Sequence, residues 1–559
     1  MRVLIRLDGQ RLDRELGTFA PGTTLAQLVT AAGGTAPPPG STLYVDAAAV
    51  PADTPLEELL LLEGSTISLA PLPRPEPLRG WSATLSGGLD AGAVIPLPAH
   101  RPLLIGRSPQ ADLVLQTESA SWNHASLELE GDGVRVRDSG STNGTLLAGE
   151  AVDGDGVLVT AGATLVMGGT TVLLRPEITE NRAPEPGSLH TLTPAATAPF
   201  NRPPRPGTPP EPDPLSPPVR KDVPPASKFS YITVLAPLLL AGAMVMMLGD
   251  ARFAMFAALS PVMAVGMWFE QKHRRAKNLK EEDERFTAAL ADFATEIADA
   301  AAVQATRRHS EIPDPATTMR IAALPTTGLW QRRAGSAGFL ALNAGIGDVP
   351  WAPRLDDRSA PVPDRLVREA LEASRIPAAP VLVDLTDAGV VGIVGDRAGA
   401  LALARSLLTQ AAVHAGPADL SIAVFSDRGR HEEWSWASWL PHTRRLGTGT
   451  SERWLSDERR RSAALLRALR DGLEESTGGT TLLVLDSEVL TEGRDAPARE
   501  LLGHGRSVPG LGGRGTAQGP RVSGIVIAAS EQQLPASCTT VITVGTDAAA
   551  SVHDLGELT

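Results

Sequence analysis

Two apolar runs in the middle of the chain constrain its fold more than any other feature. Residues 229–248 and 253–269 contain no charged side chain, and only the four residues 249–252 separate them. A helix takes roughly 20 apolar residues, and at least about 17, to cross a bilayer core of about 30 Å. The runs therefore predict a transmembrane hairpin of two helices over residues 229–269. The alternative is a helical hairpin buried inside a soluble domain.

Basic residues flank the predicted hairpin on both sides. They precede it in residues 220–228 and follow it in residues 272–280, while the connecting turn offers only Arg252. Lys and Arg concentrate in the cytoplasmic segments of membrane proteins. The pattern predicts a multi-pass protein of the cell membrane with two helices and both termini in the cytoplasm. The lipid bilayer is then its first expected partner.

Composition limits the remaining classes of function. The 559 residues are enough for several domains, and the formal net charge of −13 argues against a nucleic-acid partner for this chain. Cys538 is the only cysteine, which excludes a disulfide framework and a cysteine-based metal site. Its apolar neighbours favour a small buried residue over a nucleophile. We predict no metal and no cofactor.

Residues 1–72 have the pattern of a small module with strands and one helix. Residues 2–7 alternate as a strand, and residues 24–32 form a helix with Leu25, Leu28 and Val29 on one face. Two more strands are expected at residues 42–45 and 66–69. This order of hairpin, helix and strands resembles the ubiquitin-like (β-grasp) fold, and the resemblance implies a role in protein contact.

Short strands separated by Gly and polar turns predict a β-sandwich at residues 80–178. Three motifs occur within it in order: Gly106-Arg107-Ser108, then Ser121-Trp122-Asn123-His124, then Ser141-Thr142-Asn143-Gly144. This ordered set resembles the forkhead-associated (FHA) domain, which binds phosphothreonine peptides through loops at one end of a sandwich.

The chemistry of these motifs suits the capture of a phosphate. Arg107 offers a charge-assisted and potentially bidentate donor, while Ser121 and Asn143 offer neutral donors. The resemblance implies that Arg107 and Ser121 contact the phosphate, that Asn143 holds the peptide backbone and that Thr142 faces the peptide. It also implies that three further residues shape the loops. These are Gly106, His124 and Gly144.

One position departs from the FHA pattern. Trp122 stands where the family commonly has Arg or Asn directly after the Ser, and an indole N–H cannot replace a guanidinium charge. The alternative reading is therefore an FHA scaffold that binds an unphosphorylated partner or none.

The next two segments lack a core of their own. Residues 179–228 are dense in proline and predict an extended, disordered linker that acts as a spacer. Residues 270–308 are charged but repeat apolar residues at helical spacing, which predicts an amphipathic stalk helix. Its apolar face is expected to pack on the domain that follows or on a second copy of the chain, so self-association is a further expected contact.

Residues 311–559 alternate strands and helices, which predicts an α/β domain with a largely parallel sheet. A strand at 390–394 leads into Gly395, where a phosphate-binding loop would lie, and a buried strand at 481–485 ends in Asp486, a Walker B-like position. A working loop needs a second Gly, a Lys and a hydroxyl residue. The chain has other residues at all three positions, so the loop is degenerate and we predict no catalytic residue and no enzyme. These three are Ala400, Leu401 and Ala402.

The order of modules resembles a known family. An FHA module, a Pro-rich linker containing Arg202-Pro203-Pro204-Arg205, paired apolar runs and Trp436-Ala437-Ser438-Trp439 resemble the actinobacterial FtsK/SpoIIIE-type membrane proteins. These are relatives of the type VII secretion ATPases (EssC/EccC type). The resemblance implies that residues 311–559 are the degenerate nucleotide-binding-like domain that precedes the catalytic ATPase modules. The chain ends at Thr559, where the first such module would begin.

These observations predict a membrane-anchored FHA scaffold or adaptor of a type VII-like secretion or FtsK/SpoIIIE-like translocation apparatus. Its expected partners are a phosphothreonine-containing protein and components of the secretion or translocation membrane complex. Two alternatives remain. One is a part or subunit of an ATP-driven translocase whose intact ATPase modules are encoded separately, and the other is a phospho-signalling sensor at the membrane.

Overall fold

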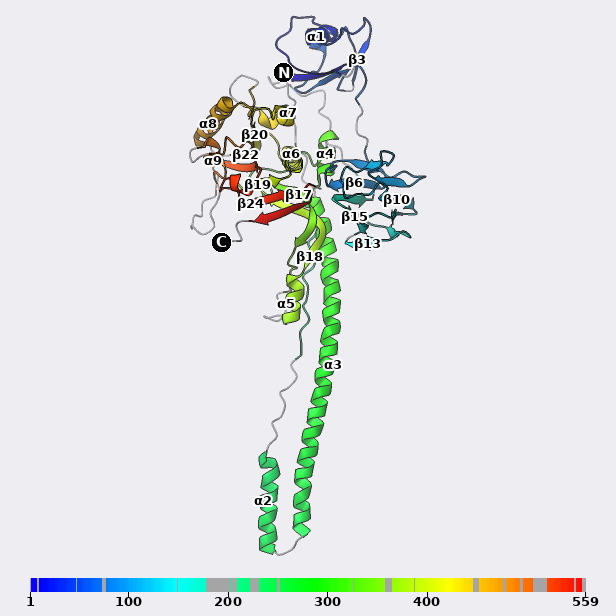
Figure 1. Ribbon diagram of the computed structural model, residues 1–559, viewed down its shortest axis with the longest axis vertical. Coiled ribbons are helices and arrows are strands. Elements are labelled where there is room, and N and C mark those ends of the chain that lie inside the picture. The colour runs from blue at the N-terminus through cyan, green and yellow to red at the C-terminus, as the bar shows by residue number, and fades with distance from the viewer. Residues whose placement is uncertain are drawn as a thin grey trace. The chain divides into compact units, whose positions relative to one another are not determined.

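In the computed structural model (Figure 1), the chain comprises two compact units. One unit comprises Met1–Pro209, Arg308–Gly347 and Ala378–Thr559, and the other comprises Pro210–Arg307 and Asp348–Pro377. The residues that the structure describes are 2–7, 10–46, 48–72, 77–147, 149–176, 202, 209–221, 231–248, 252–324, 326–356, 364–386, 388–445, 452–475, 479–492, 496–505, 520–546 and 549–554.

The first module is a five-stranded sheet covered by one helix. The strand order is β2-β1-β5-β3-β4, with β1 parallel to β5 and the other pairs antiparallel. Thr24 and Gln27 form a capping box at the start of the helix, and Leu25, Leu28 and Val29 are buried as predicted. The elements are β1 (Arg2–Leu7), β2 (Gln10–Glu15), α1 (Leu25–Ala31), β3 (Thr42–Val45), β4 (Ala48–Pro51), η1 (Leu56–Glu58) and β5 (Thr66–Ser68).

The second module is a sandwich of two sheets. Their strand orders are β14-β11-β10-β8-β9 and β13-β12-β15-β16-β6-β7. Alternate residues such as Leu127, Val136, Leu165 and Val172 are fully buried in the core. The strands are β6 (Ser82–Gly87), β7 (Val94–Pro96), β8 (Leu103–Gly106), β9 (Leu113–Val114), β10 (Ala125–Glu130), β11 (Gly133–Asp138), β12 (Thr145–Leu147), β13 (Glu150–Val152), β14 (Val157–Val159), β15 (Ala163–Met167) and β16 (Thr170–Arg175).

The third module is built on a seven-stranded sheet of order β21-β20-β22-β23-β19-β24-β25. All neighbouring pairs are parallel except the last, β24 with β25. The elements are α4 (Pro315–Ala323), β17 (Ala341–Pro350), β18 (Arg375–Asp384), β19 (Val390–Gly395), α6 (Arg397–His414), β20 (Leu420–Ser426), α7 (His431–Trp434), η2 (Ser435–Trp439), η3 (Pro441–Thr443), β21 (Leu455–Ser456), α8 (Arg459–Glu475), β22 (Thr480–Asp486), α9 (Pro497–Leu501), β23 (Arg521–Ile527), η4 (Glu531–Gln533), β24 (Thr540–Val544) and β25 (Ala550–Asp554).

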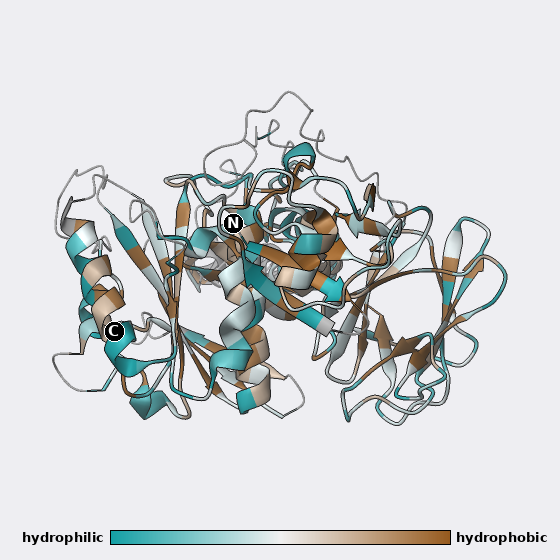
Figure 2. Cartoon of the chain, turned by 90° about the horizontal axis from the view of Figure 1, so that it is seen from above, coloured by the Kyte–Doolittle hydropathy of each residue, from teal (hydrophilic) through white to brown (hydrophobic). Residues whose placement is uncertain are grey.

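Both faces of this sheet are covered, which explains why its strands are apolar throughout. Leu482 and Val484 of β22 belong to the core beneath α6, whereas Leu483 and Leu485 belong to the core beneath α8 and α9. Brown, hydrophobic residues recur along the strands in Figure 2. Since β23 alone separates β19 from β22, the carboxyl ends of β19 and β22 lie near one another at the same edge.

The other unit has a small core of its own. It contains part of the long helix α3 (Arg252–Glu311) and the helix α5 (Arg365–Glu372). Phe286, Phe293 and Ile297 lie on the apolar face predicted for the stalk, and they pack with Val367 of α5. The apolar face of the stalk is therefore buried within the chain, rather than left over for pairing with a second copy.

The predicted transmembrane hairpin is wrong. Within the described residues, no helix combines the length and the apolar character that crossing a membrane takes. The first apolar run forms α2 (Tyr231–Leu248), a helix of 18 residues. The second run opens α3, which continues as one helix of 60 residues into charged sequence. The two transmembrane helices of the predicted fold class are withdrawn, as are the membrane location with both termini in the cytoplasm and the bilayer as a partner.

The predicted linker at residues 179–228 lies mostly outside the described residues. Only Arg202 and residues 209–221 of it are described. In the described part, Leu215 packs with Leu355 and the apolar face of α3 in the smaller unit. Leu215 therefore fixes this part of the predicted linker against the core of the smaller unit.

Candidate functional site

The four residues predicted to read a phosphopeptide lie in loops of the sandwich. Arg107 follows β8, Ser121 precedes β10, and Thr142 and Asn143 lie between β11 and β12. The backbone N–H of Arg107 donates to the carbonyl of Ser121 at 3.0 Å, which fixes the first two loops side by side. The third loop is joined to them through Ser121, so the structure brings all four residues together.

Ser121 makes that junction through its side chain. The backbone N–H of Thr142 donates to Ser121 Oγ at 2.9 Å, and the Ser121 hydroxyl donates to Thr142 Oγ1 at 3.4 Å. Asn143 adds a second link, because its Nδ2 donates to the carbonyl of Ser119 at 2.7 Å. Thr142 and Asn143 are otherwise exposed. The loops are thus held together before any ligand binds.

Arg107 is exposed, and only part of its guanidinium is used. Its Nε donates to the carbonyl of Ala120 at 2.6 Å, which fixes the direction of the side chain. The two terminal nitrogens make no hydrogen bond or ion pair with any other described residue. A guanidinium fork held in this way can bind a phosphate through two parallel bonds.

His124 supports the loops from below and is fully buried. Its Nδ1 accepts from the N–H of Ser121 at 2.9 Å, and its Nε2 lies 3.2 Å from the carbonyl of Gly144, to which it donates. Burial lowers the pKa of His124 by more than the bond to Gly144 and the charge of Asp138 raise it. The ring is therefore neutral near pH 7 and bridges two loops.

Two glycines and Asp138 complete the support. A Cβ on Gly106 would lie 2.3 Å from the carbonyl oxygen of Trp122, and Gly144 has a φ of +77°. The Asp138 carboxylate accepts from the N–H groups of Gly140 and Ser141 at 3.0 and 2.8 Å. Burial raises the pKa of Asp138, but these bonds and others lower it further, so that the group is charged.

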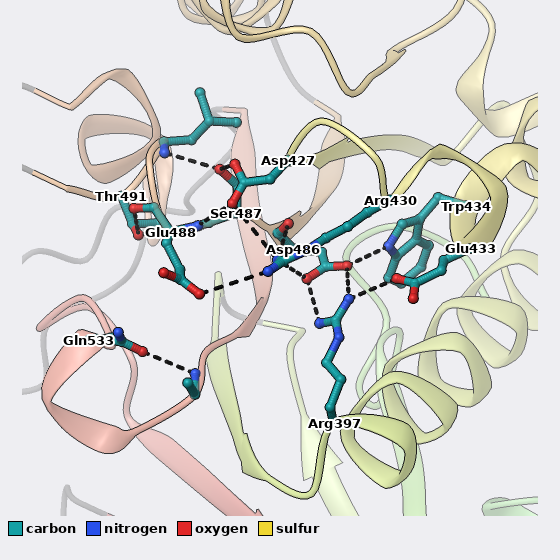
Figure 3. Close-up of polar contacts among 12 residues, drawn as sticks. Arg397, Asp427, Arg430, Glu433, Trp434, Asp486, Ser487, Glu488, Thr491 and Gln533 are labelled. Carbon is teal, nitrogen blue, oxygen red and sulfur yellow. Dashed lines mark hydrogen bonds and ion pairs between the residues drawn. The ribbon is translucent and has the colours of Figure 1, made fainter.

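The second candidate site lies at the carboxyl edge of the parallel sheet, where ligands bind in open α/β folds. Asp486 at the end of β22 is fully buried and accepts four bonds (Figure 3). Both terminal nitrogens of Arg397 donate to it at 2.6 Å, Arg430 Nη1 donates at 2.8 Å, and Trp434 Nε1 donates at 2.9 Å. Burial raises the pKa of Asp486, whereas these bonds and charges lower it to below its ordinary value.

The degenerate loop is a tight turn. Gly395, at a φ of +106°, is followed by Asp396, whose carboxylate accepts from the N–H of Gly399 and caps α6. Ala400 and Leu401 are buried in the core, and Ala402 is exposed. The start of α6 therefore already holds a carboxylate, at the place where a phosphate would bind in a working loop.

The sequence did not indicate which side chains would bind the carboxylate of Asp486. Arg397, directly after the helix cap Asp396, pairs with Asp486 and with Glu433, the latter at 2.7 Å. Arg430 was missed because it lies 56 residues from Asp486 in the chain. Trp434 is buried, and nothing in the sequence indicated that its indole N–H donates to Asp486.

Comparisons with known proteins give matches to parts of the chain. The family described as the cytoplasmic domain of an inner membrane component of T3SS (Yop-YscD) matches residues 85–177. The FHA domain-containing protein FhaB of Mycobacterium tuberculosis is 42% identical over 89 residues, which is 16% of this chain and 56% of FhaB. A solved FHA domain, that of the CT664 protein of Chlamydia trachomatis, is 25% identical with a TM-score of 0.17, covering 18% of this chain and 100% of its own.

Secretion proteins match a larger share of the chain. The ESX-4 secretion system protein EccC4 of Mycobacterium tuberculosis is 35% identical over 162 residues, 27% of this chain and 13% of EccC4. The ESX secretion system protein EccC of Thermomonospora curvata is 28% identical over 197 residues, 34% of this chain and 15% of that protein. The chain thus spans about an eighth to a seventh of these relatives. It contains an FHA-type sandwich and is homologous in part to the EccC proteins of type VII secretion systems.

Proposed function

We propose that this chain is a secretion-associated adaptor that binds phosphothreonine in a partner protein. The observation that carries the proposal is Arg107, whose Nε is anchored on Ala120 while its terminal nitrogens have no bond to any other described residue. Ser121 and Asn143 lie in loops tied to the same place. A phosphate carries about −1.5 to −2 charges at pH 7 and suits such a cationic fork.

The partner is proposed to be a protein of a type VII-like secretion or translocation apparatus. Support comes from the partial homology to EccC proteins and to FhaB, an FHA domain-containing protein. We also propose that the β-grasp-like module, which has a core of its own, contacts a partner protein.

Titration of the full chain with a phosphothreonine peptide library and its unphosphorylated counterpart tests this function. Arg107→Ala should weaken phosphopeptide binding by about 10- to 100-fold, the loss expected for a charge-assisted hydrogen bond of about 1.5–3 kcal/mol. Arg101→Ala is the matched control, since Arg101 is an exposed guanidinium of the same sandwich paired with Asp112. Equal binding of the two peptide sets, or equal affinity of Arg107→Ala and Arg101→Ala, would refute the assignment.

The α/β module is proposed to bind partners without hydrolysing ATP. Arg397 and Arg430 are both committed to carboxylates, and four carboxylates surround these two guanidiniums, namely those of Asp427, Glu433, Asp486 and Glu488. The resulting excess of negative charge, with Asp396 at the start of α6, disfavours a polyphosphate. ATP turnover by the purified full chain above that of Asp486→Asn would contradict this proposal.

A second candidate is a subunit of an ATP-driven translocase whose ATPase modules are encoded separately. The partial homology to EccC proteins favours it. The test is the ATP turnover of a separately purified EccC-type ATPase from the same organism, measured with and without this chain. A change in turnover supports a subunit, and an unchanged rate with phosphopeptide binding intact supports the adaptor alone.

A further inference from the structure

Trp122 is a large aromatic side chain that remains 56% exposed directly beside the candidate phosphate site. It follows Ser121 in the same loop, and its carbonyl accepts from the N–H of Ser108 at 2.9 Å. A Cβ on Gly106 would come within 2.3 Å of that carbonyl oxygen. The backbone of Trp122 is thus fixed tightly against the end of β8, although its indole is open to solvent.

The place of Trp122 distinguishes it from the exposed apolar residues on the strands of the sandwich. Leu104, Val114 and Leu146 are aliphatic and lie on strands. Single exposed residues of that kind are common and do not indicate a binding site. Trp122 lies instead in a recognition loop whose shape is set by Ser121 and His124. Rigid aromatic side chains in such loops are typical anchors of protein interfaces.

The charge of the site also assigns a role to Trp122. Arg107 supplies the only guanidinium among the residues assigned to the phosphate, and its Nε already donates to the carbonyl of Ala120. Where a second cation or amide would add to phosphate affinity, an indole adds apolar area. Burying that area against the peptide then adds binding strength beyond the contacts of Arg107, Ser121 and Asn143.

We infer that Trp122 selects phosphothreonine peptides that carry a large apolar side chain next to the phosphothreonine. Because Trp122 directly follows Ser121 and its indole is exposed, the residue next to a phosphothreonine held by Ser121 and Arg107 is within reach of the indole. A basic neighbour is disfavoured, since it would bring a second positive charge close to Arg107. This selectivity rests on the proposed phosphothreonine-binding function.

The experiment uses the full chain and phosphothreonine peptides that differ only in the residues flanking the phosphothreonine, which are Leu, Ser or Lys. Wild type should bind the Leu-flanked peptide about tenfold more tightly than the Ser-flanked peptide. Trp122→Ser should bring that ratio to about one and leave the Ser-flanked affinity within about twofold. Trp122→Phe should retain the preference, and Leu146→Ser, a matched exposed control in the same sandwich, should not change it.

Three outcomes would overturn the inference. The first is an Arg107-dependent phosphopeptide affinity in wild type that is equal for Leu and Ser flanks, and the second is a preference for Lys. The third is a Trp122→Ser variant that loses affinity for all peptides equally, since that result assigns Trp122 to loop structure. A protein that binds no phosphopeptide, with Arg107→Ala behaving as wild type, instead removes the proposed function together with this inference.

Discussion

Asp486→Asn perturbs the most heavily bonded carboxylate at the edge of the parallel sheet (Figure 3). The replacement keeps the size of the side chain but removes its charge and turns one oxygen into an NH₂ group. In the wild type, Oδ2 accepts from Arg397 and Trp434, and Oδ1 accepts from Arg397 and Arg430. An NH₂ group at either position faces two donors, so at least two of the four bonds are lost.

The expected loss of stability follows from burial. Removing one partner of a buried ion pair costs about 3–5 kcal/mol when the remaining charge stays buried. Here Asp486 is 0% exposed, but the side chains of Arg397 and Arg430 are 42% and 30% exposed and can regain water. We therefore expect the α/β module to lose about 2–4 kcal/mol. Glu488→Gln is the control, because Glu488 is 53% exposed and its oxygen lies 3.8 Å from Arg430.

Urea titration of the full chain, followed by hydrogen exchange of peptides from β20 and β22, measures the stability of this module alone. A double-mutant cycle with Arg397→Met should give a coupling of about 1 kcal/mol or more. Because the folded pKa of Asp486 is depressed, its stabilisation is complete above the unfolded value of about 3.9 and is lost as the pH falls through the folded value. The difference between wild type and Asp486→Asn should therefore shrink below about pH 4. A variant within about 0.5 kcal/mol of wild type at pH 7 would refute the reasoning.

Three further substitutions test residues that stabilise the sandwich and the smaller unit. Gly106→Ala should lower phosphopeptide affinity at least about tenfold in the titration above, because its Cβ displaces the carbonyl of Trp122, whereas Gly154→Ala, with no atom within 4 Å, should not. His124→Ala should destabilise the sandwich by about 2–4 kcal/mol in hydrogen exchange, since the partly buried N–H of Ser121 and carbonyl of Gly144 lose their partner. The wild-type sandwich should also lose stability as the pH falls below about 6.5, because the depressed pKa of His124 means that the unfolded chain binds the proton first, and the variant should lack this dependence. Phe286→Ala should cost the smaller unit about 3–5 kcal/mol by chemical denaturation, and an unchanged midpoint would contradict a core there.

Local patterns predicted much of the fold because they report which residues are buried. The alternation in residues 2–7 and the apolar run at 481–485 correspond to β1 and β22, and the spacing of Phe286 and Phe293 to the buried face of α3. The hairpin at 229–269 failed because apolar content does not set the length of a helix. The second apolar run opens α3, a helix of 60 residues that continues into charged sequence, whereas α2 has 18 residues.

The candidate sites were predictable only where neighbours in sequence are neighbours in space. The FHA motifs identified Arg107, Ser121 and Asn143, since short loops carry them. Long-range pairs such as Arg430 with Asp486, 56 residues apart, leave no pattern in a single sequence. The bond from Asn143 to Ser119 was equally hidden, because it depends on the approach of two loops.

The degenerate loop has a structural reason that the missing residues alone do not reveal. Leu401, at the position of the loop Lys, is 7% exposed, and Ala400 is 2% exposed in the core beneath α6. A Lys at position 401 would bury its charge against that core, at a cost of several kcal/mol. Asp396 caps the helix that these residues anchor, and Arg397 follows it to close on Asp486. Restoring Lys and Ser at positions 401 and 402 should therefore destabilise α6. It should not create nucleotide affinity, because Asp396 already caps the start of the helix and Arg397 already pairs with Asp486.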